Sequence, residues 1–515
     1  MVAAERRLGG ARLGNDVRRR LPRLQAAHAA LDPAPARRGG AVSALAAELR
    51  RIVGTAAVRD DPAGLLAYES DALTLFRCKP AAVVLPGTRD QLIEVVAALH
   101  RHDVPFTARG AGTGLSGGAL VPEGGVILGL ARLNRILEVR PEDACAVVEP
   151  GVVNAELSRA VERWGLRYAP DPASQNVCTV GGNLAENAGG PHCFRHGMTA
   201  QHVLSAEVLL ADGSVETWGT TLAAEDDLDL RGFLVGSEGS VGVALRIGVR
   251  LIPLPECVVT LFGAYDSVQD ACATVSDIVA AGLTPVALEV MDQKAVAAVE
   301  ASLYRAGYPL EAGAVLLVEV EGPAQKTRDD ADEIEAFLRR RRPLRVERAA
   351  TPEQRLALWK GRKGAGGALG RLGPDSYVMD GVVPRSRLAQ VMDYVDQVEA
   401  ESGLPVANLF HAGDGNIHPH FSYDARDPQQ ARAVEEAGAR ILRRCLQLGG
   451  SLTGEHGIGL EKQAFLGEQF GAADIALMER LRRAFNPRDR LNPGKGLPLG
   501  RGCAESFHRH GGYRA

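Results

Sequence analysis

The chain has 515 residues, of which 46% are apolar and 24% are charged, and its formal net charge is -4 at pH 7. This length predicts roughly two to four globular domains, and the slightly acidic charge argues against a general nucleic-acid-binding protein. The eight cysteines form no C-x-x-C pair, which argues against an iron–sulfur cluster, a zinc ribbon or a disulfide framework and favours a reducing cytoplasm.

The N-terminal segment, residues 1–44, shows no hydrophobic periodicity and contains "DPAPARRGG". We predict a flexible extension here, with the first helix beginning near Ser43. The Arg- and Ala-rich composition leaves a transit peptide as an alternative, whereas a Sec signal would need an apolar run that the segment lacks. No stretch of the sequence is apolar over the roughly 18 residues that a membrane-spanning helix requires.

Residues 45–255 are expected to form a first domain that is rich in short strands and glycine. "AAVVLP" is typical of a strand, and Thr88 with Gln91 predicts a capping box for the helix that follows. Asn154 is a candidate N-cap for the helix "AELSRAVERWG". The stretch "AEVLLADGSVETW" predicts a hairpin that turns at Asp212 and Gly213.

From residue 256, strands such as "VVTLFGAY" and "AVLLVEVEG" alternate with long helices, which is the pattern of an α+β domain. We predict that this second domain covers residues 256–498 and includes a helical end at residues 427–484. Residues 499–515 are expected to be a tail. The predicted fold class of the whole chain is α+β.

The glycine-rich loop "RGAGTGLSGG", residues 109–118, contains a G-x-G-x-x-G match from Gly112 to Gly117. A dinucleotide-binding fold needs a helix directly after these glycines, because the helix N-terminus receives the pyrophosphate. Pro122, Gly124 and Gly125 break any such helix, so a Rossmann NAD site is rejected. Successive glycines still permit N–H groups to converge on an anion, and a plain glycine-rich turn is the alternative.

Two further glycine-rich stretches follow, at residues 170–191 and 235–243. Three such loops in one strand-rich domain predict a large ligand with many polar atoms, such as a cofactor that carries phosphate. Together with "VEPGV" and "TVGGNLAENAGG", the loops come in the order seen in FAD-binding domains of the p-cresol-methylhydroxylase type, which the chain resembles.

The resemblance implies that the first loop holds the FAD pyrophosphate and that the later loops surround the flavin and adenosine. Some relatives attach FAD covalently through a histidine in the first loop. This loop has none, so non-covalent FAD is expected. The implied cofactor-binding residues are Arg109, Gly110, Ala111, Gly112, Thr113, Gly114, Ser116, Gly117, Gly118, Pro172, Ser174, Thr179, Gly182, Asn183, Glu238 and Gly242.

Three histidines, His411, His418 and His420, crowd the stretch "NLFHAGDGNIHPH". His411 and His418 are seven residues apart, which would place them on opposite faces of one straight strand. The turn at residues 413–416 removes this constraint, because it can fold the strand back and bring both imidazoles together. Histidines that line a polar turn without a metal are the alternative.

Glu455 and His456 are neighbours in "GGSLTGEHGIGLEK". Neighbouring residues on a helix do not face the same way, so one of the pair can bind a metal while the other points at a substrate. Two histidines and one carboxylate would form a three-ligand site with an open position for water or substrate.

The motifs of the second half, among them "LWKGRK", "SYVMDGVVP" and "LNPGKGLP", resemble the FAD subunit of bacterial glycolate oxidases and, more broadly, flavin dehydrogenases of D-2-hydroxy acids. The resemblance implies an α+β, ferredoxin-like cap domain with a helical C-terminal end. It also implies that a divalent metal, expected to be zinc, is bound by His411, His418 and Glu455.

By the same resemblance, His456 is the catalytic base, Asn416 contacts the substrate and Arg362 binds the substrate carboxylate. His420 lies beyond the motif, so a packing or supporting role is expected for it. No lysine stands near Val378, which disfavours the longer substrate 2-hydroxyglutarate.

We therefore predict an enzyme that oxidises glycolate or D-lactate to the 2-oxo acid, with the hydroxyl proton passing to His456 and the hydride to flavin N5. The resemblance implies a second FAD-type subunit and an iron–sulfur subunit as partners, and a cytoplasmic protein held at the inner face of the membrane through them. Three alternatives remain: a D-lactate dehydrogenase that consists of one polypeptide and reduces a cytochrome or quinone, a zinc hydrolase, and an inactive scaffold subunit.

Overall fold

The computed structural model describes residues 38–220 and 228–498. The predicted extension lies outside the described residues up to position 37, and so does the predicted tail at residues 499–515. The first described helix, α2 (Arg38–Val53), begins before the predicted start at Ser43. Its Leu45 and Leu49 are buried in the core that α2 shares with a neighbouring helix and sheet.

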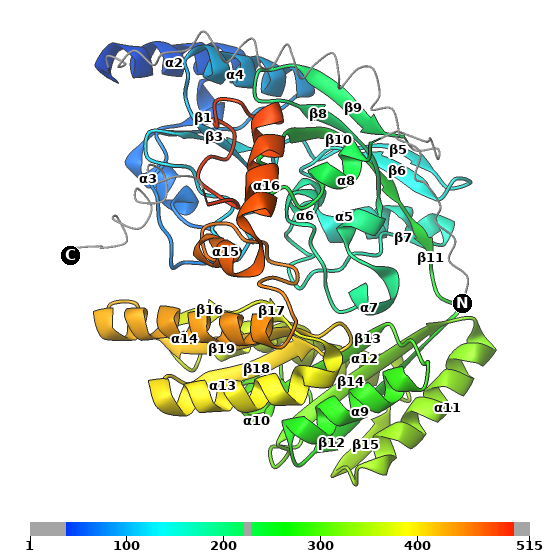
Figure 1. Cartoon of the computed structure of the whole chain (residues 1–515). Coiled ribbons are helices and arrows are strands. Elements are labelled where there is room, and N and C mark those ends of the chain that lie inside the picture. Colours follow the sequence, from blue (N-terminus) through cyan, green and yellow to red (C-terminus); the bar gives the residue numbers. More distant parts are fainter. Residues whose placement is uncertain (1–37, 221–227, 499–515) are drawn as a thin grey trace, which may run out of the picture.

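Figure 1 shows two bodies, one above the other in that view. The first body comprises residues 38–220 and 228–253, and the second body comprises residues 257–448. The remaining C-terminal segment, residues 449–498, passes from the second body back to the first (Figure 1). Helices and strands occur together in both bodies, so the predicted α+β class is confirmed.

Two main sheets form the first body. In the four-stranded sheet, with the order β1-β2-β4-β3, the last three strands are parallel and β1 is antiparallel to β2. The five-stranded sheet, with the order β5-β6-β10-β8-β9, is antiparallel, and β7 pairs with β11 separately. The strands are Val58–Arg59 (β1), Ala82–Val84 (β2), Phe106–Arg109 (β3), Val126–Gly129 (β4), Ile136–Arg140 (β5), Cys145–Val148 (β6), Leu166–Arg167 (β7), Val203–Leu209 (β8), Val215–Gly219 (β9), Val243–Arg250 (β10) and Ile252–Pro253 (β11).

The remaining helices of the first body are short except for α4. They are Pro62–Leu65 (α3), Arg89–Arg101 (α4), Asn154–Val161 (α5), Val180–Glu186 (α6), Cys193–His196 (α7) and Leu230–Leu234 (α8). The predicted hairpin is confirmed, since β8 and β9 pair from Leu209 and Val215 around a turn in which Gly213 has a φ of 91°.

Two predicted helix caps differ in detail from the structure. Thr88 Oγ1 accepts a hydrogen bond from the N–H of Gln91 as expected, but the Gln91 side chain accepts from the N–H of Gly87, one residue before the cap. Asn154 is the first residue of α5 and not its N-cap. Its amide donates to the carbonyl of Pro170, because this buried tertiary partner replaces the local one.

One eight-stranded antiparallel sheet forms the second body. Its order is β15-β12-β14-β13-β18-β19-β16, with β17 paired to β19 beside β16. The strands are Cys257–Tyr265 (β12), Ala287–Asp292 (β13), Ala314–Gly322 (β14), Arg345–Arg348 (β15), Asp375–Val378 (β16), Gly381–Val382 (β17), Val406–His411 (β18) and Asn416–Tyr423 (β19).

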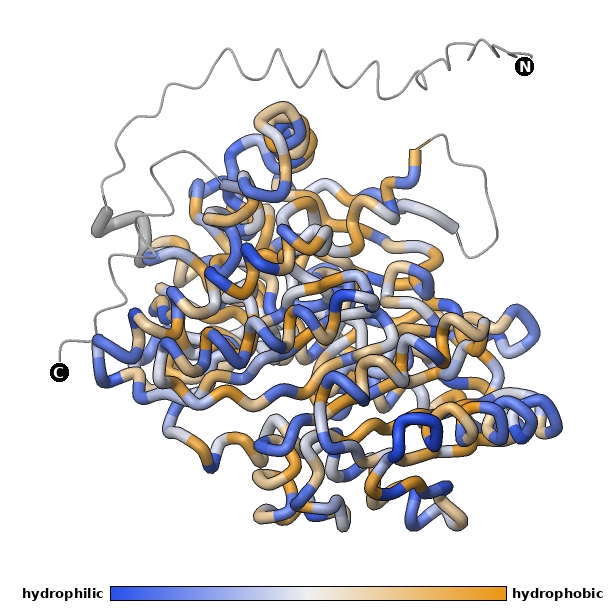
Figure 2. The backbone as a smooth tube through the Cα atoms, turned by 60° about the horizontal axis from the view of Figure 1, so that its bottom comes forward, coloured by the Kyte–Doolittle hydropathy of each residue, from blue (hydrophilic) through white to orange (hydrophobic). Residues whose placement is uncertain are grey.

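Helices cover both faces of this sheet. One face packs against α9 (Val268–Ala280), α11 (Ala324–Arg340), α13 (Leu388–Ser402) and α14 (Pro428–Gln447). The opposite face packs against α10 (Gln293–Glu300) and α12 (Pro352–Leu369). In Figure 2, hydrophilic and hydrophobic residues are interspersed along the helical turns of the tube. No described helix is both long and apolar enough to cross a membrane.

The C-terminal segment differs from the predicted helical end. After α14, five glycines between residues 449 and 459 accompany an irregular loop, and only α15 (Leu466–Gln469) and α16 (Ala472–Phe485) follow as α-helices. Helix α16 lies on the first body (Figure 1), where the Phe485 ring is 5.4 Å from the rings of Trp218 and Phe233. Leu491 is buried in the core of the first body. The predicted domain boundary near residue 256 stays a prediction.

Buried charges join the two bodies. His192 of the first body lies between two carboxylates, with Nδ1 2.7 Å from Asp171 and Nε2 3.3 Å from Glu319 of β14. Glu319 is fully buried and also accepts hydrogen bonds from Arg355 and Trp359 of α12. Burial by itself would lower the pKa of His192, but the two carboxylates outweigh it and raise that pKa to about 10.

Candidate active site

A cleft in the first body collects the three glycine-rich loops and encloses about 1370 Å³ of empty space that is open to solvent. Glu455 and His456 of the C-terminal segment also line it. All of the predicted cofactor-binding residues line this cleft except Ser116 and Gly117. Those two lie behind it, where the carbonyl of Ser116 accepts from the N–H of Leu460 and Gly117 lies against the Leu460 side chain.

The first loop has the properties of an anion-binding backbone. Gly112 has a φ of +75°, and a Cβ there would lie 2.3 Å from the guanidinium of Arg109. A Cβ on Gly110 would lie 2.4 Å from Thr179 Oγ1, so the first and second loops touch with no room for a side chain. Within the part of the chain that the structure describes, the backbone N–H groups of residues 111–118 donate no hydrogen bond. Such a set of free donors fits the pyrophosphate of FAD.

The histidine cluster lies on one face of the sheet of the second body. The tight turn between β18 and β19 sets His411 opposite Asn416, and alternation along β19 then places His418 and His420 on the same face. The rings of His411 and His418 are 5.2 Å apart. The turn between the strands therefore brings His411 and His418 to the same face of the sheet, as the sequence predicted.

Each of these two imidazoles has its Nδ1 atom held by an acceptor. His411 Nδ1 donates to Glu289 on β13, at 2.7 Å, and His418 Nδ1 donates to the carbonyl of Met379, at 3.0 Å. Both Nε2 atoms lie close to the same oxygen, Oε1 of Glu455, at 3.3 Å and 3.2 Å. Burial alone would lower the pKa of His411, but Glu289 and Glu455 outweigh it and raise that pKa well above its usual value, so a metal bound here would take the place of the proton on His411 Nε2. Metal-binding histidines in proteins are usually oriented by such second hydrogen bonds.

Two sets of side chains have the spacing of a metal site, and His418 belongs to both: one adds His411 and Glu455, the other Asp380 and His456. Asp380 is fully buried, and its carboxylate already accepts a hydrogen bond from the ammonium group of Lys462, among other donors. Both oxygens of Asp380 already accept hydrogen bonds, so neither is free to bind a metal ion in addition to the Lys462 ammonium group. The set of His411, His418 and Glu455 therefore fits a divalent metal better.

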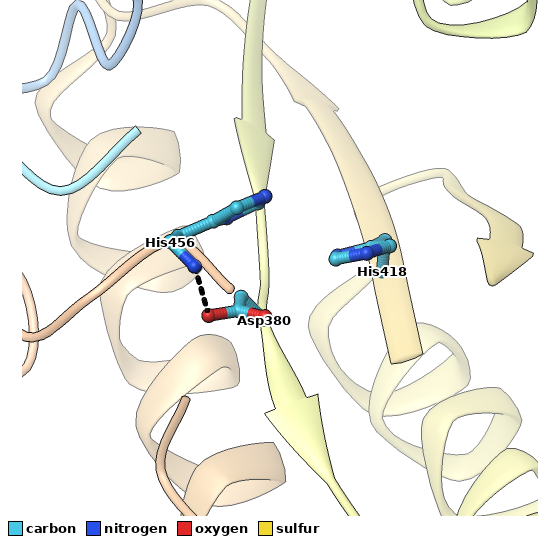
Figure 3. Close-up of side chains that lie close together, drawn as sticks. All are labelled: Asp380, His418 and His456. Carbon is cyan, nitrogen blue, oxygen red and sulfur yellow. Dashed lines mark hydrogen bonds between the residues drawn. The ribbon is translucent and has the colours of Figure 1, made fainter. Parts of the chain in front are cut away.

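His456 lies beside this set without joining it. Its ring stacks on that of His418 with centroids 5.0 Å apart, and its Nδ1 atom has no hydrogen-bond partner among the described residues. Figure 3 shows the two histidines near each other and near Asp380. Burial lowers the pKa of His456 to about 4, so its imidazole is uncharged at neutral pH. An uncharged imidazole that lines the cofactor cleft can accept a proton there.

Three other predicted residues lie close to the cluster. Arg362 of α12 is 4% exposed, forms an ion pair with Glu289 and leaves its Nε atom without a partner in the described structure. The Asn416 amide donates to Asp380 and to the carbonyl of Gly381, so only its oxygen is left for a substrate.

His420 is buried on β19, and no hydrogen bond to its imidazole is found within the described residues. Burial is the main cause that lowers its pKa to about 3, and the nearby guanidinium of Arg362 adds to it, so the imidazole stays uncharged. Its predicted supporting role stays a prediction.

Reasoning from the sequence did not find Glu289 or Asp380. Each lies in a mostly apolar stretch, "ALEVMD" and "SYVMDGVV", and both are fully buried. The only available signal was that a buried carboxylate requires polar partners, which does not say where those partners lie in the sequence.

Comparisons with known proteins agree with this geometry. Two family models match, the FAD binding domain at residues 80–219 and the C-terminal domain of FAD linked oxidases at residues 254–496. The glycolate oxidase subunit GlcD of Escherichia coli (strain K12) is 42% identical over 451 residues, which cover 87% of this chain and 90% of that protein. The chain belongs to the FAD-linked oxidases.

Other members of the FAD-linked oxidases are similar over most of the chain. GlcD of Bacillus subtilis (strain 168) is 38% identical and covers 87% of this chain and 95% of its own length. A D-lactate dehydrogenase of Anaerostipes hadrus is 31% identical and covers 83% of this chain and 92% of its own length. The solved structure of p-cresol methylhydroxylase with substrate bound has a TM-score of 0.77 at 17% identity, over 90% of this chain and 98% of that one.

These findings confirm the predicted family, the p-cresol-methylhydroxylase type of FAD-binding fold, FAD as the cofactor and an oxidoreductase as the kind of enzyme. Membership of the FAD-linked oxidases also argues against the alternative of a zinc hydrolase. The roles of individual site residues, the metal and the domain limits stay predictions.

Proposed function

We propose that the chain oxidises a small 2-hydroxy acid, glycolate or D-lactate, to the corresponding 2-oxo acid. One observation carries the proposal: the adjacent residues Glu455 and His456 line the FAD cleft and also contact the histidine cluster of the second body. The flavin cleft and the histidine cluster are therefore next to each other.

In this proposal, His456 accepts the proton of the substrate hydroxyl while the hydride leaves the neighbouring carbon. The uncharged state of its imidazole at neutral pH suits this role. When bound, the metal supplies positive charge that lowers the pKa of the hydroxyl, and FAD supplies the hydride acceptor.

Arg362 is proposed to bind the substrate carboxylate. Its guanidinium is planar, buried and held by Glu289 on one side, while Nε is free for an anion. Glu289 thus contacts both the carboxylate-binding arginine and the metal ligand His411. Glu289 on β13 can therefore orient both Arg362, which binds the carboxylate of the hydroxy acid, and His411, which binds the metal near its hydroxyl group.

The electron acceptor is proposed to be a partner protein. GlcD relatives are named as subunits of glycolate oxidase, which supports a multi-subunit enzyme. The proposed partners are a second FAD-type subunit and an iron–sulfur subunit, and the proposed location is the cytoplasm at the inner face of the membrane. The D-lactate dehydrogenase relative is not named as a subunit, which favours the second candidate, a single polypeptide. Its proposed electron acceptor is a cytochrome or a quinone.

The proposal is tested by anaerobic mixing of the purified, FAD-loaded protein with glycolate, D-lactate, L-lactate and 2-hydroxyglutarate. Glycolate or D-lactate is expected to bleach the flavin absorbance, and failure of every 2-hydroxy acid to do so would contradict the proposed function. Retention of colour in the pellet after acid precipitation would contradict non-covalent FAD.

Two variants separate the proposed roles. His411→Ala is expected to lose both metal and turnover, because a three-ligand site that loses one ligand holds its ion weakly. His456→Ala is expected to keep metal and FAD while flavin reduction slows by about a hundredfold to ten-thousandfold. Elemental analysis beside flavin-reduction kinetics decides between them, and loss of metal only in the His456 variant would reverse the assignment.

A further inference from the structure

The loop that carries Glu455 and His456 has no regular structure of its own, and one buried carboxylate holds it. Asp380, between β16 and β17, accepts hydrogen bonds from three successive backbone N–H groups, those of Gly454 at 3.1 Å, Glu455 at 3.2 Å and His456 at 3.0 Å. The hydroxyl of Thr453 donates to it as well. Figure 3 shows Asp380 directly below the backbone nitrogen of His456.

Asp380 also joins this loop to the rest of the second body. The Asn416 amide of β19 donates to it at 2.8 Å, and the buried ammonium of Lys462 donates at 3.0 Å. Lys462 follows the loop in sequence and also donates to the carbonyl of Gly457. The carboxylate is therefore the common acceptor for the β19 strand and for both ends of the loop.

The next part of the loop is held by a carboxylate of the other body. Glu238 of the first body accepts from the N–H groups of Ile458 at 2.7 Å and Gly459 at 2.8 Å. The loop thus has one carboxylate from each body, and Asp380 is the one that contacts the residues with reactive side chains. The side chain of Glu455 reaches His411 and His418, the ring of His456 stacks on that of His418, and both residues also line the cofactor cleft. The N–H contacts with Asp380 fix the backbone from which these two side chains extend.

We propose that Asp380 is a positioning residue of the active site, which fixes the loop so that Glu455 meets the metal-binding histidines while His456 faces the substrate. This inference rests on the proposed function for the identity of the reaction. The hydrogen-bond geometry that carries it does not depend on which substrate is oxidised.

Asp380→Asn tests the proposal, because asparagine has nearly the same shape but lacks the charge and one acceptor oxygen. Asp292→Asn is the matched control. Asp292 is also buried, lies in the same sheet and accepts from two backbone N–H groups, those of Ala295 and Asn408, but it has no hydrogen bond to residues 453–459. Both variants are expected to lower the midpoint of thermal unfolding and to retain FAD.

Three measurements should separate the two variants. In Asp380→Asn, amide hydrogen exchange in residues 453–459 is expected to accelerate, zinc is expected to bind at least tenfold more weakly, and flavin reduction at saturating substrate is expected to slow by about a hundredfold. Asp292→Asn is expected to match the wild type in all three. A folded Asp380→Asn protein with wild-type exchange in this loop and wild-type flavin reduction would overturn the proposal.

Thr453→Val covers the case in which Asp380→Asn does not fold. It removes one donor to Asp380 and leaves the carboxylate in place, and it is expected to accelerate exchange of the same amides and to slow flavin reduction by a smaller factor. Unchanged exchange and reduction would then overturn the proposal. If no 2-hydroxy acid reduces the wild-type flavin, the proposed function fails, whereas exchange and zinc binding still decide the role of Asp380.

Discussion

Glu289 is the side chain whose replacement should show most directly that the histidine cluster binds a metal. It is fully buried on β13, accepts from His411 Nδ1 and pairs with Arg362. Glu289→Gln keeps the volume and can still accept one hydrogen bond, but it removes the negative charge. The hydrogen bond that orients His411 then becomes neutral, and the buried guanidinium of Arg362 loses its carboxylate.

Two magnitudes follow for this variant. Removal of a hydrogen-bonding partner behind a metal-binding histidine typically weakens metal affinity about 10- to 100-fold, which corresponds to about 1.4 to 2.7 kcal/mol. Loss of one partner of a buried ion pair costs about 3 to 5 kcal/mol of the free energy of unfolding, and the remaining hydrogen bond places this variant at the lower end. Zinc competition titration with a chelator measures the first quantity and urea denaturation the second.

Glu319→Gln is the matched control for Glu289→Gln. Glu319 lies on the neighbouring strand β14, is equally buried and pairs with Arg355, but it contacts no member of the histidine cluster. We expect a similar loss of unfolding free energy and unchanged zinc affinity. The reasoning would be refuted if Glu289→Gln bound zinc as tightly as the wild type, or if Glu319→Gln weakened zinc binding equally.

Two further predictions concern the FAD cleft and the contact between the bodies. Gly112→Ala is expected to bind FAD at least tenfold more weakly, as measured from flavin absorbance. Its φ is +75°, and the added Cβ would lie 2.3 Å from a guanidinium nitrogen of Arg109. The control Gly124→Ala also has a positive φ, +82°, but lies in open space and should retain FAD. His192 is protonated between Asp171 and Glu319 with a pKa of about 10, against 6.5 when unperturbed, so its stabilising contribution is complete below about pH 6.5 and is lost as pH rises toward 10. Urea denaturation across this range should therefore show a steeper loss of stability for the wild type than for His192→Gln, and equal pH slopes would contradict the assignment.

The sequence predicted those parts of the site that depend on neighbours along the chain. The cofactor loops were found because positive φ angles and close backbone contacts require glycine at fixed places, as at Gly112. The pairing of His411 with His418 was predictable from the length of the turn between them. Side chains alternate between the two faces along any strand, so the face on which a residue lies can be predicted without knowing the fold.

What the sequence could not predict were contacts between distant segments. Glu289 meets His411, and Asp380 meets the N–H groups of residues 454–456, only because the sheet order brings these segments together. The predicted N-cap at Asn154 was wrong for the same reason, since its side chain donates to the carbonyl of Pro170. Local patterns give no information about a competing partner elsewhere in the fold.

The return of α16 to the first body has a consequence for biosynthesis. Trp218 and Phe233 are made early, but the ring of Phe485 that packs on them, and the buried Leu491, are among the last of the described residues to leave the ribosome. Along the chain, the second body therefore lies between two parts of the first body and is synthesised before the later part. The strands of its sheet all precede residue 424, so a nascent polypeptide that stalls near residue 450 would contain every strand of that sheet but would lack side chains that complete the cores of both bodies, such as Leu452 and Leu491.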